Sequence, residues 1–385
     1  MAELYVPSFD GIRGLVSLSI ALVHVQLAVH WLPGHEALRA LRGSWYFSIE
    51  FLFLLGGFVA FLPLAFYGRF AGIRSYAIRR AGRILPLYCV TVVLAVALGG
   101  WLRPVVGVED SVAPHDLEAV LIHLAFLQQE LLRFSGFGVQ GIVWTMSIVA
   151  AFYVLFPLVA RAYLRRPVLG LVAAVTISIA WRTLVAEESR AFVQFPLFVS
   201  DFAMGMTAAH VYVRVRRRGG LGQHAALGLA GGGLIALLAL LYVAGLPIAR
   251  REGLGLYWRE GAALSVAVPA AFALVLVAAP FTPRWAQWPV ANPVARWIGQ
   301  VSYGLFLFHF LVIWSVLGVA DIARDGSQSS VLELTALVIP LTLLMGWLGT
   351  RFIERPLRER AQRLAARSRR ERPLDAPVLV PSPTK

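Results

Sequence analysis

About ten long apolar runs, each able to cross a bilayer as a helix, constrain this chain more than any other feature. A helix of about 20 residues spans the hydrocarbon core, where every backbone polar group must bond within the protein. The sequence is 58% hydrophobic and only 15% charged, with a mean hydropathy of +0.71. We therefore predict an all-α, polytopic transmembrane helical bundle. The predicted spans are residues 12–32, 45–66, 84–101, 143–163, 168–186, 194–213, 225–246, 261–279, 297–318 and 331–352.

The net charge of +14 is distributed as membrane-flanking charge, so we do not expect nucleic-acid binding. If the N-terminus is cytosolic, most arginine clusters between spans fall inside and most acidic loop residues fall outside, with Arg324 among the exceptions. This bias predicts that both termini are cytosolic. The single cysteine, Cys89, excludes an internal disulfide and a multi-cysteine metal site, and we expect no metal.

The domain organisation follows from the same pattern. Residues 1–355 form one predicted transmembrane domain. Residues 356–385 form a basic and then proline-rich cytosolic tail, predicted to be disordered. An amphipathic piece at 117–133 is predicted to be an interfacial or re-entrant helix.

The first apolar run, FDGIRGLVSLSIALVH at residues 9–24, carries three ionisable residues. Asp10 and Arg13 lie at its start, and His24 lies about 16 Å beyond Arg13 along a helix. An ionisable side chain that deep in a membrane helix indicates a functional site. The alternative is a buried histidine that bonds a neighbouring helix.

Glu50 lies in the second predicted span at a depth similar to that of His24. Consecutive spans are usually neighbours, and a carboxylate beside a histidine fixes its tautomer. We therefore predict a dyad in which Glu50 tunes His24 as a general base. A simple hydrogen bond between the helices is the alternative.

A block of arginines precedes the third predicted span. Arg79, Arg80 and Arg83 run directly into Ile84-Leu85-Pro86 and are predicted to lie near membrane level, where they suit a phosphate-rich ligand from the cytosol. Arg69 and Arg74 are ascribed to topology alone.

Several short motifs then follow in an order that resembles the membrane-bound acyltransferase-3 family, the O-antigen and exopolysaccharide O-acetylases. The matches are Arg13 and His24 in R-x10-H; Glu50 in the acidic motif 48–58, where Gly56 replaces a usual serine; Arg79, Arg80, Arg83, Ile84, Pro86 and Tyr88 in R-R-x-x-R-I-x-P-x-Y; Trp144, Ser147, Phe152, Tyr153, Phe156 and Pro157 in W-S-L-S-x-E-x-x-F-Y-x-x-F-P; residues 302–309 in S-Y-x-L-Y-L-x-H; and residues 352–356 in the closing I-E-x-P. Val149 stands where the fourth motif has its acid.

The resemblance implies an integral membrane O-acyltransferase of a bacterial cytoplasmic membrane. Its donor would be cytosolic acyl-CoA, acetyl-CoA by default, with no permanently bound cofactor. Arg13 and the 79–83 cluster would pair the donor phosphates, and His24 would be the catalytic base. The implied acceptor is a cell-surface polysaccharide or a lipid-linked oligosaccharide. Further substrate-binding candidates, for which helix packing is the alternative, are Asp10, Trp144, Ser147, Ser302, Tyr303 and His309.

Three other interpretations remain at this stage. The acceptor is alternatively a macrolide-like small metabolite. A second alternative is that the chain is a multi-span transporter. A histidine near the middle of the membrane is equally common in that class, although the sequence shows no matched pair of broken helices. The chain is alternatively a catalytically silent partner subunit, since the motif acid at Val149 is missing.

Overall fold

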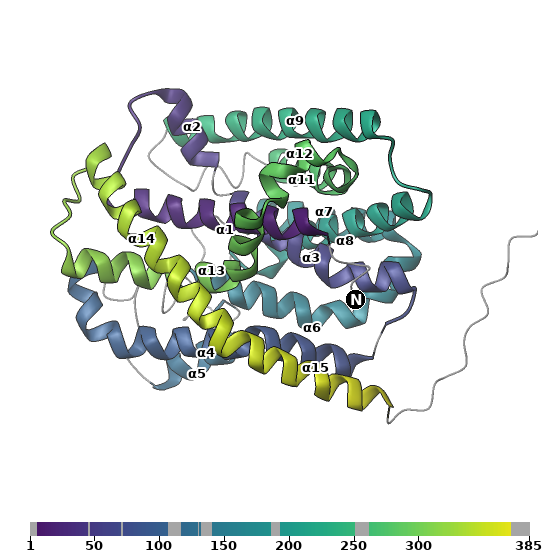
Figure 1. Ribbon diagram of the computed structural model, residues 1–385, viewed down its shortest axis with the longest axis horizontal. Coiled ribbons are helices and arrows are strands. Elements are labelled where there is room, and N and C mark those ends of the chain that lie inside the picture. Colours follow the sequence, from purple (N-terminus) through teal and green to yellow (C-terminus); the bar gives the residue numbers. More distant parts are fainter. Residues whose placement is uncertain are drawn as a thin grey trace, which may run out of the picture.

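The computed structural model describes residues 6–44, 47–70, 72–106, 117–129, 131, 141–185, 193–250 and 262–370. These residues form an all-α bundle without strands (Figure 1). Its α-helices are α1 (Pro7–Ala28), α2 (Glu36–Ser44), α3 (Phe47–Tyr67), α4 (Ile73–Val106), α5 (Leu117–Leu124), α6 (Trp144–Arg165), α7 (Pro167–Leu184), α8 (Phe195–Arg217), α9 (Gln223–Arg250), α11 (Leu264–Ala278), α12 (Arg284–Ala291), α13 (Pro293–Val319), α14 (Gln328–Gly349) and α15 (Arg355–Arg370). A 3₁₀ turn (Ala279–Phe281) follows α11, and a π-helical turn (Thr350–Glu354) joins α14 to α15.

Within the described ranges, nine helices are long and apolar enough to cross a membrane. The protein is therefore an integral, multi-pass membrane protein, as predicted. The remaining predicted span, 194–213, corresponds to α8, whose 23 residues are also long enough to span a bilayer. Asp201 and a basic C-terminal turn make α8 more polar than these nine helices.

The bundle has two ends, which are visible in Figure 1. At the first, here called the N-terminal end, α1 and α13 begin and α15 lies along the start of α4. At the opposite end lie α2 and the turn between α13 and α14. Arg324 in that turn donates to the carbonyl oxygens of Ala28 and Val105, at the C-terminal ends of α1 and α4. Arg324, an exception to the predicted charge bias, therefore caps two helices.

Glycines set the closest approaches between the central helices. A Cβ on Gly299 of α13 would lie 1.9 Å from the carbonyl oxygen of Asp10 in α1. A Cβ on Gly57 of α3 would lie 2.1 Å from the carbonyl oxygen of Phe202 in α8. Small residues allow such contacts, on which helix association in membranes depends. The pairs α1–α13 and α3–α8 therefore form the frame of the bundle.

Two buried apolar clusters fill the space around these pairs. One surrounds α3, α6, α8 and α11, and the other surrounds α1, α4, α13 and α14. Ile49 and Leu52 of α3 pack against both clusters, so the two meet along α3.

Two segments differ from the prediction in extent. Among its described residues, 117–129 and 131, the amphipathic piece predicted at 117–133 is helical over α5, where the Tyr88 hydroxyl donates to the carbonyl of His123 at 2.8 Å. The basic part of the predicted tail forms α15, because its many arginines and alanines favour a helix and one face packs on α4. Residues 371–385 lie outside the described residues.

Candidate functional site: an arginine-lined cavity and a histidine pair

A cavity of about 770 Å³ opens where the two apolar clusters meet, at the N-terminal end of the bundle. Among the described residues, its lining includes six arginines and the carboxylates of Asp10 and Glu354. The arginines come from α1, α4, α13 and α15, and they are Arg13, Arg80, Arg83, Arg296, Arg355 and Arg358. This excess of guanidinium groups suits a ligand with several phosphate charges.

Arg13 is held in place by α13. Its Nε donates to the Ser302 hydroxyl at 2.9 Å and to the Gly299 carbonyl at 3.2 Å, and its Nη2 also donates to Gly299. The same Nη2 lies 3.3 Å from Asp10 Oδ1. The fixed side chain points into the cavity with about a quarter of its surface exposed.

The predicted arginine block divides in the structure. Arg80 and Arg83 line the cavity, and the Arg80 guanidinium lies over the ring of Tyr153, 4.8 Å from its centroid. Arg79 lies off the lining and donates to Ser75 one turn earlier. The cavity therefore contains two of the three predicted arginines in this block.

The opposite wall of the cavity is apolar. On α3, the residues between 49 and 62 that remain partly exposed are Ile49, Leu52, Gly56 and Val59, and all four line the cavity. Their spacing places them on one face of the helix. Val149 of α6 lines the same wall. The residue that replaces the acid of the fourth motif therefore lies at the surface of the cavity.

His24 faces α13, beyond the inner end of the cavity. Its Nδ1 lies 2.9 Å from the carbonyl oxygen of Ile20 and 3.2 Å from Nε2 of His309. Nδ1 of His309 lies 2.6 Å from the carbonyl oxygen of Phe306. Phe306 also lines the cavity, with its ring centroid 5.9 Å from that of His309. Phe306 therefore connects the cavity lining to the histidine pair.

These contacts assign the tautomers of two neutral rings. A carbonyl oxygen only accepts, so Nδ1 carries the proton in both His24 and His309. The His24 Nδ1–H is then bifurcated, and Nε2 of His309 is its second acceptor. Nε2 of His24 is left with the free lone pair that a general base requires.

Glu50 has a different partner from the predicted one. Its carboxylate lies 3.7 Å from Nη2 of Arg182, and both side chains are 1% exposed. Asp201 of α8 is equally buried and interacts electrostatically with both. Within the described residues, no hydrogen bond joins Glu50 to His24. The predicted dyad is not formed, because α3 turns Glu50 toward α7 and α8.

The remaining candidates separate into two groups. Asp10, Ser302 and Tyr303 line the cavity, and the Tyr303 hydroxyl donates to the Ile84 carbonyl at 2.8 Å. Trp144 and Ser147 lie off its lining, with the Trp144 ring centroid 5.8 Å from that of Phe198.

Sequence reasoning missed three cavity arginines. Arg296 directly precedes the predicted span 297–318, Arg355 is the last residue of the predicted transmembrane domain, and Arg358 lies in the predicted tail. Arg355 directly follows Glu354 in the closing motif, which was the one available signal. Their convergence depends on α15 folding back along α4, which no local pattern predicts.

Comparisons with known proteins identify one matching family and several related proteins. The model of a family described as an acyltransferase domain, acyltransferase-3, matches residues 6–350. A peptidoglycan O-acetyltransferase, OatA, of Listeria monocytogenes is 22% identical over 92% of this chain and 56% of its own length. An O-acetyltransferase OatA of Staphylococcus aureus is 22% identical over 92% of this chain and 58% of its own length. The chain thus spans somewhat more than half the length of these relatives. No solved structure matches it.

Proposed function

Because the chain belongs to the acyltransferase-3 family of membrane proteins, we propose that it transfers an acyl group, acetyl by default, from acyl-CoA to a hydroxyl of a sugar-containing acceptor. The observation that carries this proposal is the arginine-lined cavity, which leads from the N-terminal end of the bundle toward His24.

The donor phosphates bind at the cavity mouth. Coenzyme A carries several phosphate charges, and charge-assisted contacts to arginine are the strong form of phosphate recognition. Arg13, Arg80 and Arg83 form the first contacts, together with Arg296, Arg355 and Arg358. The pantetheine arm then extends past Ser17 along α1, toward the histidine pair.

His24 is the base of the transfer step. Its Nε2 takes the proton of the acceptor hydroxyl as the oxygen attacks the thioester carbon. The new ester C–O bond forms, the C–S bond breaks, and the proton passes to the departing CoA sulfur. Phe306 stands between the cavity and His309, so its side chain rotates away when the thioester reaches His24.

The acceptor approaches from the opposite end of the bundle. The Listeria relative is named for peptidoglycan, and a cell-surface polysaccharide or lipid-linked oligosaccharide is the acceptor class proposed here. With the N-terminal end of the bundle cytosolic, in agreement with its arginines, the reaction joins a cytosolic donor to an external acceptor. The membrane is a bacterial cytoplasmic membrane, because both of these relatives are bacterial proteins.

A donor titration tests this assignment. Arg13→Ala, Arg80→Ala and Arg83→Ala should each raise the apparent KM for acyl-CoA by about 10- to 150-fold, since each removes a charge-assisted contact of about 1.5–3 kcal/mol. Arg69→Ala and Arg74→Ala are the matched controls, because both residues are exposed and lie off the cavity lining. If all five variants behave alike, the cavity does not bind the donor phosphates.

A further inference from the structure

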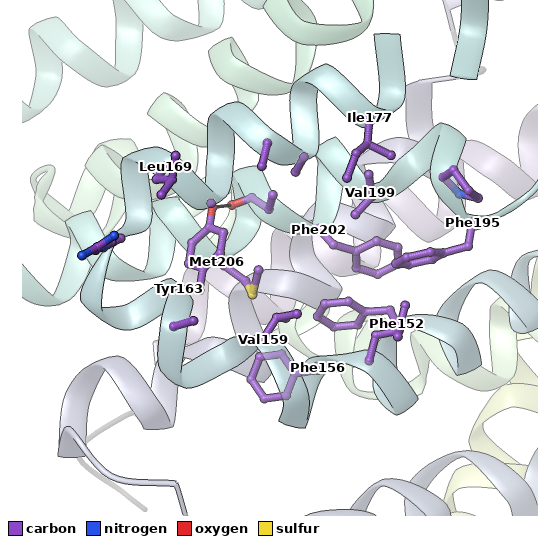
Figure 2. A pocket seen from close by; sticks show the side chains of 18 of the residues that line it. Phe152, Phe156, Val159, Tyr163, Leu169, Ile177, Phe195, Val199, Phe202 and Met206 are labelled. Carbon is purple, nitrogen blue, oxygen red and sulfur yellow. Dashed lines mark hydrogen bonds between the residues drawn. The ribbon is translucent and has the colours of Figure 1, made fainter. Parts of the chain in front are cut away.

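A second hollow, of about 740 Å³, lies between α6, α7 and α8 and is apolar along most of its length. Figure 2 shows its walls, with Phe152, Phe156, Phe195 and Phe202 on one side and Leu169 and Ile177 of α7 on another. The Tyr163 hydroxyl already donates within the bundle, to Ala203 or Thr207. This groove therefore contains little that a polar ligand would contact.

Small residues of α7 line the groove. Gly170, Ala173 and Ala174 lie on one face of α7, and Gly170 lies so close to α6 that a Cβ there would be 2.4 Å from the Tyr163 ring. Leu155, Val159 and Ile177 at the rim are 41%, 45% and 49% exposed. In a spanning helix such side chains face the hydrocarbon of the bilayer. A lipid alkyl chain fills an apolar hollow at that depth, because the atoms that line an empty hollow would lose van der Waals contacts.

One end of the groove carries positive charge. Arg165 and Arg166 line it where α6 ends and α7 begins, and both are exposed. This is the N-terminal end of the bundle, because Tyr163 packs against Phe61, and Phe9 of α1 packs against Phe58 one turn earlier in α3. Two guanidinium groups above an apolar groove match one phosphate above its alkyl chains.

We propose that this groove binds an acidic phospholipid, with one alkyl chain against the phenylalanines and the phosphate on Arg165 and Arg166. The groove shares a wall residue with the arginine-lined cavity, since Phe202 lines both. Phe202 stacks on Phe152, with ring centroids 4.2 Å apart. The bound chain thus supports a wall of the proposed donor site. The lipid site itself does not depend on that proposed function.

The test measures lipid retention by purified full-length protein. Native mass spectrometry is used after exchange into mixtures of phosphatidylglycerol and phosphatidylcholine. The wild type should retain one phosphatidylglycerol in preference to phosphatidylcholine. Arg165→Gln/Arg166→Gln should weaken this binding by about 30-fold, or about fivefold for each arginine, a factor that corresponds to about 1 kcal/mol. The matched control Arg69→Gln/Arg74→Gln removes two exposed arginines off the groove and should leave retention unchanged.

A second pair of variants tests the alkyl-chain position. Ala173→Phe places a ring in the groove from an exposed position and should abolish retention, whereas Val172→Phe, at a neighbouring position outside the lining, should not. The proposal is overturned if the wild type retains phosphatidylcholine equally. It is also overturned if the two arginine pairs lose lipid alike, or if Ala173→Phe retains phosphatidylglycerol. Because acyl transfer is not measured, failure of the proposed enzymatic function would leave this result unaffected.

Discussion

His24 and Glu50 lie on neighbouring helices but face different partners. His24 contacts His309 of α13, whereas Glu50 contacts Arg182 of α7. The depth argument placed both residues at a similar level, and the two helices do meet there, since Ser19 and Ser48 are 2.9 Å apart. Depth does not fix the rotation of a helix about its axis, so the sequence alone assigned the wrong partner to His24.

The tautomer argument makes His309 a positioning residue. His309→Ala removes one of the two acceptors of the His24 Nδ1–H, the other being the Ile20 carbonyl oxygen, and should lower the rate of transfer by about 2- to 13-fold, the value of one net hydrogen bond. His309→Gln keeps an acceptor oxygen and should recover most of the rate. The ¹⁵N shifts of His24 should report a protonated Nδ1 in the wild type. A glutamine variant as slow as the alanine variant would contradict the positioning role.

Glu50→Gln separates a structural role from a catalytic one. Glu50→Gln leaves Arg182 with the buried Asp201, so stability should fall by about 1–3 kcal/mol, the value of one charge-assisted contact. The pH dependence of transfer by the folded fraction should stay unchanged. Glu50→Gln/Arg182→Gln leaves Asp201 without the buried Arg182 cation and should lower stability further, by about 3–5 kcal/mol. A stable Glu50→Gln protein with an altered pH profile would instead support the predicted tuning of His24.

At the scale of the elements, two adjacent glycines of α3 make different contacts. A Cβ on Gly57 would lie 2.1 Å from the Phe202 carbonyl oxygen, whereas a Cβ on Gly56 would lie 3.4 Å from the Phe202 ring. Gly57→Ala should therefore force α3 and α8 apart and lower thermal stability by about 1–3 kcal/mol, the cost of overpacking. Gly56→Ala is the matched control and should change stability little. Equal stability of the two variants would contradict this account of α3–α8 packing.

Apolar patterning predicted the element order well, because hydropathy and length alone determine which segments can cross a bilayer. It placed α6 and α7 within two residues of their observed ends. It began the third span at residue 84, whereas α4 begins at Ile73. The arginines before residue 84 continue the helix at the N-terminal end of the bundle, where their side chains reach the cavity rather than lipid.

At the scale of the whole molecule, the site depends on contacts between distant parts of the chain. Arg13 is fixed by Ser302, and His24 by His309. Both contacts follow from α1 and α13 lying parallel, a pairing that spans almost the full sequence. The sequence motifs therefore named three of the six cavity arginines and both histidines, whereas the cavity itself, its other three arginines and the contact between the histidines required the assembled bundle.

The central claim is that acyl-CoA consumption depends on His24. The measurement is CoA release from acetyl-CoA by membranes containing the wild type or His24→Ala, supplied with cell-envelope glycans. Wild-type membranes should release CoA, and His24→Ala should reduce that release by about 10²-fold or more while its level in the membrane stays normal. Wild-type turnover by His24→Ala would contradict the account.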